Sequence, residues 1–118
     1  MILGLGIDIC EVKRIKGLID RYGERFLKRV YTEEELRKKT VESLSARFAA
    51  KEATIKALGG YFINSLKEIS VINTEEGKPK IELRGKALRR FCELGGKSIY
   101  LSLSHTKEIA CAVVIIEG

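Results

Sequence analysis

Four charged side chains within one predicted helix have the types and spacing of a functional site. Glu52 and Lys56 lie four residues apart, so at about 3.6 residues per turn they project from the same side of the helix. Arg47 and Lys51 have the same spacing but project from a side roughly 140° away. The first pair offers a carboxylate beside an ammonium group, and the second offers two cations. Alternatively, both pairs are ordinary solubilising charges on a helix surface.

A further acidic residue, Asp8, lies at the end of a predicted strand over residues 2 to 9. Apolar side chains alternate along one face of this strand, while Gly4 and Gly6 share the other face with Ile2 and Asp8. A face that carries two glycines has room for a close ligand or for another backbone. Asp8 could instead be a cap or turn residue before the helix that begins near Glu11.

The helix that carries Glu52 is predicted from about residue 41 to residue 58, and it ends at Gly59–Gly60, which can adopt the left-handed conformation. It has a bulky apolar stripe, which we expect to face a sheet, and an alanine stripe, which would let a second backbone or a subunit come close. The bulky stripe contains Leu44, Phe48, Ile55 and Leu58, and the small stripe contains Ala46, Ala50, Ala53 and Ala57.

The other predicted elements place these residues in an α+β fold. Periodicity predicts a helix over 11–22, a short helix that starts with a capping box at Thr32–Glu35, and a helix over 86–94. Strands are predicted over 69–73, 79–83, 99–104 and 109–116, with a turn at 105–108. We expect one domain, residues 1–118, in which a mainly antiparallel sheet packs against helices on one side.

Composition restricts the class of protein and partner. The chain has 118 residues, 45% of them hydrophobic, and a net charge of +6, which favours an anionic partner: nucleic acid, a phosphorylated small molecule or an acidic protein. Nucleic acid is disfavoured because few aromatic residues stand beside the dispersed basic ones.

The absence of a long apolar run and of a basic leader predicts a cytoplasmic protein that does not span a membrane. Cys10, Cys92 and Cys111 are expected to be buried free thiols, and one His without a Cys-x-x-Cys motif does not favour zinc.

Taken together, four segments resemble the holo-acyl-carrier-protein synthases, the short type of 4′-phosphopantetheinyl transferase. The likeness spans nearly the whole chain in the family's order, and the helix motif is its most specific part. The segments are Gly6-Ile7-Asp8-Ile9 followed by Arg14, then Phe48-x-x-Lys51-Glu52-Ala53-x-x-Lys56-Ala57-x-Gly59, then Gly77-Lys78-Pro79, and Leu101-Ser102-Leu103-Ser104-His105-Thr106.

The resemblance implies transfer of 4′-phosphopantetheine from coenzyme A to a serine of apo-acyl carrier protein, in support of fatty acid biosynthesis, with release of adenosine 3′,5′-bisphosphate. It implies Mg²⁺ as the cofactor, with Asp8 and Glu52 as its ligands, because a divalent cation spreads the charge of the diphosphate. Glu52, or a metal-bound water that it orients, is the implied general base. Lys56 would neutralise or protonate the leaving phosphate.

The resemblance also implies contacts with coenzyme A, with the carrier protein and between subunits. The acidic carrier would bind at Arg14, Arg21 and Arg25, and the protein would be a homotrimer with coenzyme A between neighbours. Cys10 stands where longer family members have another acidic residue, so water is expected to complete the metal shell. The implied contacts with coenzyme A are Arg47, Lys51, Lys56, Gly59, Pro79, Ser104, His105 and Thr106.

The alternative interpretation is a non-catalytic binding module for a nucleotide or an acidic protein. Asp8 would then be a cap, and Glu52 and Lys56 a surface pair. The mass of an apo-carrier protein after incubation separates the two hypotheses, since transfer adds phosphopantetheine and binding adds nothing.

Overall fold

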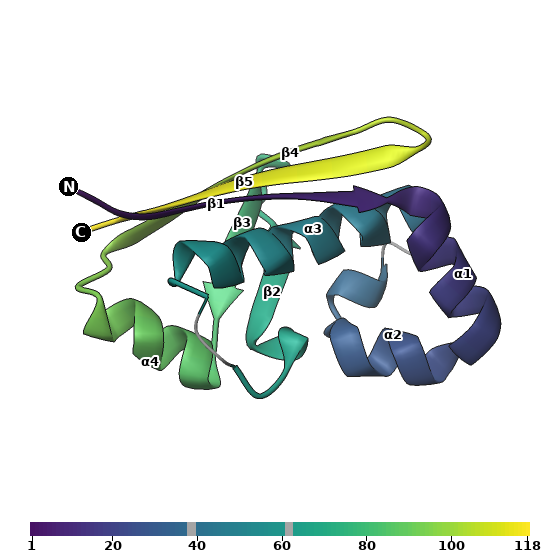
Figure 1. The fold of residues 1–118 in the computed structure, drawn as a ribbon, viewed down its shortest axis with the longest axis horizontal. Helices are drawn as coiled ribbons and strands as arrows, with labels where there is room; N and C mark the ends of the chain where they lie inside the picture. The colour runs from purple at the N-terminus through teal and green to yellow at the C-terminus, as the bar shows by residue number, and fades with distance from the viewer. Residues whose placement is uncertain (38–39, 61–62) are drawn as a thin grey trace.

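The fold is built around one long helix that lies under a three-stranded sheet. The computed structural model describes residues 1–37, 40–60 and 63–118. Helix α3 (Val41–Ala57) crosses beneath β1 (Ile2–Glu11), β5 (Ile109–Glu117) and β4 (Ser98–His105), which pair antiparallel in the order β1-β5-β4 (Figure 1). The first and last strands are therefore neighbours, so the two ends of the chain close the same sheet.

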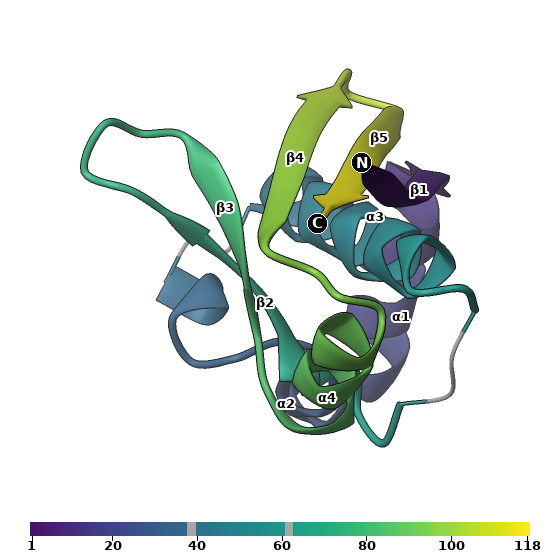
Figure 2. The same cartoon turned by 90° about the vertical axis from the view of Figure 1, so that its left-hand side faces the viewer.

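The remaining elements pack around the other sides of α3. Figure 2 shows the second sheet as a hairpin that projects beyond the body of the molecule. This hairpin consists of β2 (Ile69–Asn73) and β3 (Pro79–Leu83). The helices are α1 (Val12–Tyr22), α2 (Glu24–Val30) and α4 (Gly85–Glu93), with short 3₁₀ turns η1 (Glu35–Arg37) and η2 (Leu66–Glu68). No helix in the described part of the chain is long and apolar enough to cross a membrane.

The α+β class and the antiparallel pairing are confirmed, but several details differ from expectation. The strands form two sheets instead of one. Helix α2 was not predicted; it follows Gly23, whose φ of 56° separates it from α1, and it buries Leu27 and Val30. All three cysteines are free, but Cys92 is exposed and Cys111 only partly buried.

Helix α3 begins and ends where local chemistry predicts. The side chain of Thr40 caps its first turn by accepting a hydrogen bond from the Ser43 amide at 3.1 Å. Beyond Ala57, Gly59 and Gly60 have φ angles of 87° and 73°, which glycine adopts without steric cost. Two glycines therefore stop the helix about one turn beyond Lys56.

The side of α3 that meets the large sheet is the alanine stripe and not the bulky one. A Cβ atom at Gly4 would overlap the carbonyl oxygen of Ala57, and one at Gly6 would overlap that of Ala53. The glycine face of β1 therefore receives a backbone of the same chain, one of the two possibilities that the sequence left open. Leu44 and Phe48 instead lie in the core with residues of α1, α2 and the segment that follows them.

The other face of the large sheet is apolar and uncovered within the chain. Leu5 and Ile9, on the edge strand β1, are 64% and 63% exposed. The large exposed hydrophobic side chains on these three strands are Ile2, Leu5, Ile7, Ile9, Tyr100 and Ile109. We call this surface the outer sheet face. An apolar patch of this kind marks an interaction surface in most proteins.

Candidate active site

Asp8 lies beside α3 because the strand that carries it packs so closely on the helix. It follows Gly6 by two residues, so it belongs to the same face of β1. Its carboxylate accepts a hydrogen bond from Lys56, with 3.0 Å between Nζ and Oδ1. Lys56 Nζ also donates to the carbonyl oxygen of Ile7 at 2.9 Å. The structure thus brings together two predicted site residues that are 48 positions apart in the sequence.

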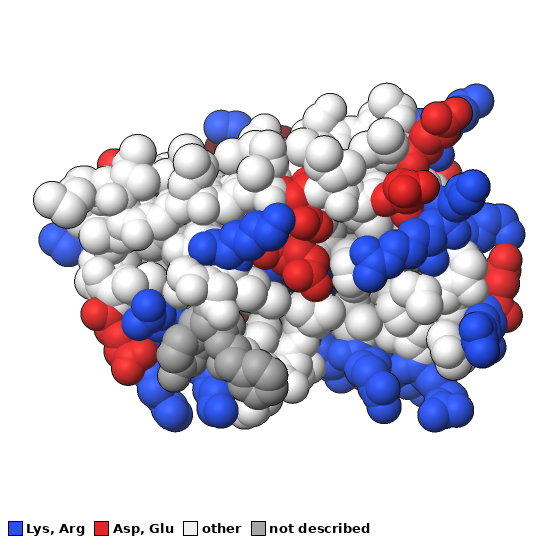
Figure 3. Space-filling view, in the orientation of Figure 1, with Lys and Arg blue, Asp and Glu red and all other residues white. Residues whose placement is uncertain are grey.

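Glu52 shares the electrostatic environment of Asp8. Burial raises the pKa of the Glu52 carboxyl group, and the negative charge of Asp8 raises this pKa further. The positive charges of Arg14 and Lys56 act in the opposite direction. Figure 3 shows acidic side chains over the middle of α3, between basic side chains on both sides. Two carboxylates that repel each other would be stabilised by a shared cation.

The donor set at this site fits a magnesium ion. Among the described residues, no group of three or more His, Cys, Asp or Glu side chains could hold a metal. Mg²⁺ needs fewer protein ligands than that, because it keeps several waters and is commonly bound by one or two carboxylates with substrate phosphates. Asp8 and Glu52 supply two carboxylates. Cys10 is buried, and burial raises the pKa of its thiol, which disfavours the thiolate that a metal would need.

Arg14 lies at the edge of this site. Its guanidinium carbon is 5.4 Å from the centre of the Phe48 ring, a cation–π contact that joins α1 to α3. Its positive charge also lowers the pKa of Glu52. Arg14 belongs to α1, and Figure 3 shows basic side chains at the end of the molecule away from the termini.

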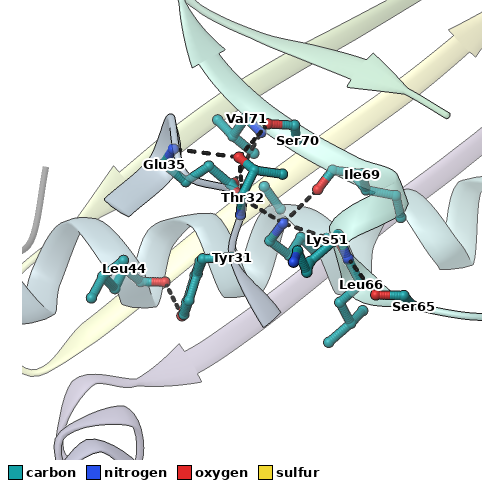
Figure 4. A network of polar contacts seen from close by, with 12 residues as sticks. Tyr31, Thr32, Glu35, Leu44, Lys51, Ser65, Leu66, Ile69, Ser70 and Val71 are labelled. Atoms are coloured by element: carbon teal, nitrogen blue, oxygen red, sulfur yellow. Dashed lines mark hydrogen bonds and ion pairs between the residues drawn. The ribbon is translucent and has the colours of Figure 1, made fainter. Parts of the chain in front are cut away.

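Lys51 has a different place from the one expected for a contact with coenzyme A. Its side chain is 0% exposed, and its ammonium group forms an ion pair of 2.7 Å with Glu35 (Figure 4). It also donates hydrogen bonds to the carbonyl oxygens of Leu66, at 3.0 Å, and Ile69. All three donors of the ammonium group are therefore used inside the protein, which leaves none for a ligand in this arrangement, and the contact of Lys51 with coenzyme A stays a prediction.

Glu35 completes this buried network. Its carboxylate accepts hydrogen bonds from the backbone amides of Thr32 and Val71, both at 3.0 Å. The Thr32 hydroxyl contacts the hydroxyl of Ser70 at 2.9 Å. The predicted capping box of Thr32 and Glu35 is therefore present, but its glutamate also joins η1, α3 and β2. Sequence reasoning missed this second role, because nothing local marks Glu35 as the partner of a lysine 16 residues away.

Arg47 is also largely buried, at 7% exposure. One of its terminal nitrogens donates to the Ser43 hydroxyl, while its Nε has no hydrogen-bond partner among the described residues. Burial lowers the pKa of Arg47, and the charge of Glu35 partly offsets that effect. Within this protomer Arg47 is a buried cation near Glu35 and Tyr31, with little surface left for a ligand.

The other residues expected at coenzyme A lie in separate parts of the chain. His105 is in the row of the sheet that contains Ala110 and Cys10, so it belongs to the inner face, whereas Ser104 belongs to the outer sheet face. The Thr106 hydroxyl accepts hydrogen bonds from the amides of residues 108 and 109, both at 3.1 Å, and so shapes the β4–β5 turn. His105 and Thr106 line a hollow of about 500 Å³.

Pro79 and Gly59, the other two residues expected at coenzyme A, lie in two further parts of the protomer. Pro79 lines a groove of about 420 Å³ between β3 and β4, together with Lys78, Lys80 and Tyr100. Gly59 follows the end of α3, on the side of α4. A single protomer therefore assembles Asp8, Glu52 and Lys56, but it does not assemble all the residues expected at coenzyme A into one cavity.

A groove between α1 and α2 was missed in the sequence. Leu18, Tyr22 and Phe26 line it with Arg25 and Arg29, and its volume is about 280 Å³. Arg21 lies next to it, with its guanidinium carbon 5.4 Å from the centre of the Tyr22 ring. The spacing of Leu18, Tyr22 and Phe26, four residues apart, was a signal for a shared apolar side. It was hidden because α2 was not predicted.

Known proteins share this fold and sequence. Residues 4–114 match the family model of the 4′-phosphopantetheinyl transferase superfamily. The holo-(acyl-carrier-protein) synthase of Treponema denticola is 50% identical over 125 residues, which cover 100% of both chains. The crystal structure of the Neisseria meningitidis synthase has a TM-score of 0.89 at 36% identity and covers 100% of both chains. The Helicobacter pylori synthase in complex with coenzyme A has a TM-score of 0.84 at 30% identity, with 96% of this chain and 99% of that chain covered.

Proposed function

This chain belongs to the 4′-phosphopantetheinyl transferase superfamily, among its holo-(acyl-carrier-protein) synthases, and we propose that it transfers 4′-phosphopantetheine from coenzyme A to a serine of apo-acyl carrier protein. In this reaction the serine oxygen forms a bond to the β-phosphorus, the bond from that phosphorus to the bridging oxygen breaks, and adenosine 3′,5′-bisphosphate leaves. The serine proton goes to a base. The product carrier would serve fatty acid biosynthesis in the cytoplasm.

The observation that carries the proposal is the contact between the Asp8–Lys56 pair and the helix turn that bears Glu52. Lys56 donates to Asp8 at 3.0 Å, and the charges of both residues affect the pKa of Glu52. Asp8 and Glu52 would hold Mg²⁺, which, when bound, spreads the charge of the diphosphate. Lys56 is 55% exposed along its side chain, so its ammonium can reach the oxygen of the leaving phosphate and stabilise its charge there.

Glu52 is also our candidate for the residue that receives or orients the serine proton. A carboxyl group with a raised pKa is a better proton acceptor than an ordinary one at the same pH. The positive charges of Arg14 and Lys56 act against this rise in the pKa of Glu52.

We further propose that the carrier protein docks on α1 and α2. Arg14, Arg21 and Arg25 would attract its acidic surface, and the groove of Leu18, Tyr22 and Phe26 would take an apolar side chain. This arrangement explains why a chain of net charge +6 exposes apolar and basic groups at one place. Charge reversal of Arg25 to Glu should raise the KM for the carrier and leave the KM for coenzyme A unchanged.

Self-association into a trimer is part of the proposal. The outer sheet face is apolar and exposed, and a neighbouring copy would cover it. Ser104, His105 and Thr106 of one protomer could then meet a coenzyme A molecule that Asp8 and Glu52 of the next protomer bind. A trimer would therefore bring into one binding site residues that lie apart within one protomer.

The test is the mass of purified apo-carrier protein after incubation with the enzyme, Mg²⁺ and coenzyme A. We expect the mass to increase by one phosphopantetheine group. Glu52→Gln keeps the shape of the side chain and removes its charge, so it should abolish most of the transfer. Glu93→Gln, a change of the same kind at an exposed residue of α4, serves as the matched control and should retain activity. Full activity of Glu52→Gln would refute the role assigned to Glu52.

A further inference from the structure

Lys56 is the counter-ion of Asp8, in addition to the role proposed for it above. Its ammonium lies 3.0 Å from Oδ1 of Asp8 and 2.9 Å from the carbonyl oxygen of Ile7. The Asp8 side chain is only 20% exposed, so its carboxylate is mostly shielded from water and depends on a nearby positive charge. Lys56 supplies that charge from helix α3.

The charges around the two carboxylates of the site balance. The negative charge of Asp8 raises the pKa of Glu52, and the positive charges of Arg14 and Lys56 lower it. Two carboxylates are thus matched by two cations. The contacts agree with this balance, because Lys56 binds Asp8 directly and Arg14 lies over the Phe48 ring of the same helix.

A site with balanced charges attracts a divalent cation weakly. A cation that approaches Asp8 must share the carboxylate with the ammonium of Lys56, and like charges repel each other at such distances. A diphosphate changes this balance, since its negative charges attract both the ammonium and the cation. The Lys56 side chain is 55% exposed and has a flexible stem, so it can turn from Asp8 toward an anion without disturbing the core.

We propose that Lys56 keeps Asp8 and Glu52 from binding a divalent cation on their own, and that it releases Asp8 when a diphosphate enters; the inference rests on the transferase function proposed above. Coenzyme A and the metal ion then bind with positive cooperativity, and each raises the affinity of the protein for the other by the same factor. The consequence is that the protein retains a metal ion only together with the substrate whose charge the ion neutralises.

The experiment measures the binding of Mn²⁺ with and without saturating coenzyme A, by the electron paramagnetic resonance signal of the free ion. Mn²⁺ is the probe because it takes the same oxygen ligands as Mg²⁺. Wild-type protein should bind Mn²⁺ weakly alone and roughly tenfold more tightly with coenzyme A. Lys56→Met should bind Mn²⁺ alone roughly tenfold more tightly than the wild type and gain less from coenzyme A.

Three further variants separate the contact from its charge. Lys56→Arg keeps the positive charge and should keep the weak binding of Mn²⁺ alone. Arg14→Met removes a cation that does not contact Asp8, so it should tighten the binding of Mn²⁺ alone but leave the gain from coenzyme A unchanged. Lys16→Met, which removes a charge from the exposed 2.9 Å pair with Asp20, is the matched control and should alter neither affinity.

Each contrary outcome overturns the inference. Equal binding of Mn²⁺ alone by the wild type and by Lys56→Met, whether tight or undetectable, would show that the ammonium does not limit the site. An equal gain from coenzyme A in these two proteins, or an equally reduced gain in Arg14→Met, would show that Lys56 is not displaced from Asp8. Wild-type protein that fails to modify the carrier would refute the proposed function itself, whereas active wild-type protein with any of these results would refute only this inference.

Discussion

At the scale of single residues, the acidic site has an electrostatic cost in the absence of a cation. Glu52 is partly buried and close to another carboxylate, and both factors raise its pKa. Lys56 and Arg14 offset part of this cost. The arrangement of Glu52 and Asp8 would suit a bound cation, but it makes the charged form of Glu52 unfavourable in the free protein.

The raised pKa of Glu52 predicts a pH-dependent effect of its removal. The unfolded chain has the ordinary value near 4.5, so between that pH and the folded pKa the native state holds more protons than the unfolded state. Stability therefore falls as pH rises through this range. Without divalent cations, Glu52→Gln should melt at a higher temperature than the wild type at pH 7, and the difference should shrink below pH 4.5. A difference that is the same in thermal melts at pH 4 and pH 7 would contradict this reasoning.

The buried pair of Lys51 and Glu35 predicts a large loss of stability when only one partner is removed. Lys51→Met leaves the Glu35 carboxylate buried without its counter-charge, which should lower the free energy of unfolding by about 3–5 kcal/mol. Adding Glu35→Leu should recover part of this loss. The matched control is Lys16→Met, which breaks an exposed pair with Asp20 and should cost about 0–1 kcal/mol. Denaturant titrations measure the free energy of unfolding of all three variants. Equal losses in Lys51→Met and Lys16→Met would show that burial of the Lys51–Glu35 pair does not set the size of the loss.

At the scale of elements, the contact between β1 and α3 positions the site. Gly4 and Gly6 let the strand approach the carbonyl oxygens of Ala57 and Ala53. Asp8 follows on the same face of the strand, and Lys56 meets it from the helix. The separation of these two backbones thus decides whether the carboxylates can share one ion.

Gly6→Ala should therefore harm both stability and activity. The added Cβ would overlap the backbone of α3, and an overpacked contact of this kind costs about 1–3 kcal/mol. The shift should also separate Asp8 from Glu52 and reduce transfer to the carrier. Gly17→Ala is the control, because nothing lies within 4 Å of its Cβ and alanine favours a helix by about 0.5–1 kcal/mol. Unfolding and transfer assays on both variants test this, and a fully active Gly6→Ala protein would show that the close approach is not required.

At the scale of the whole molecule, the outer sheet face is an exposed apolar surface that no element of the chain covers among the residues the structure describes. The core lies on one side of the large sheet, and large apolar side chains remain exposed on the other. The predicted cofactor residues Ser104 and His105 lie at the same end of the sheet as Asp8 but across two strand spacings, about 10 Å. The exposed apolar face and the distance of Ser104 and His105 from Asp8 are both consistent with coenzyme A sites that two copies of the chain share.

We expect the protein to have three times the protomer mass of 13.2 kDa in solution, and Ile7→Lys to reduce that mass. A lysine in the middle of the outer sheet face would bury an unpaired charge if a neighbour covered it. Leu88→Lys alters another exposed apolar residue, on α4, and should leave the mass unchanged. Size-exclusion chromatography with light scattering measures the mass, and a monomeric wild-type protein at micromolar concentration would contradict the trimer.

Much of the fold follows from local sequence patterns. Alternation identified the strands, and the periodicity of residues 41–58 identified α3 to within one residue at its end. Helix α2 escaped prediction because seven residues rich in charge show too little periodicity, and it depends on burying Leu27 and Val30 against the rest of the molecule. Residue type and motif also singled out Asp8, Glu52 and Lys56, and the structure brings Asp8 and Lys56 into contact, while their chemical roles stay predictions.

The sequence by itself determined which residues can do chemistry and the angles between them along one helix, because these depend only on residue type and on 3.6 residues per turn. It did not determine how that helix is rotated within the molecule. Only the tertiary structure turned the alanine stripe toward β1, which left Glu52 and Lys56 beside Asp8 and buried Lys51 against Glu35. The physical reason is that periodicity fixes relative directions, whereas contacts with distant segments decide which direction faces the core.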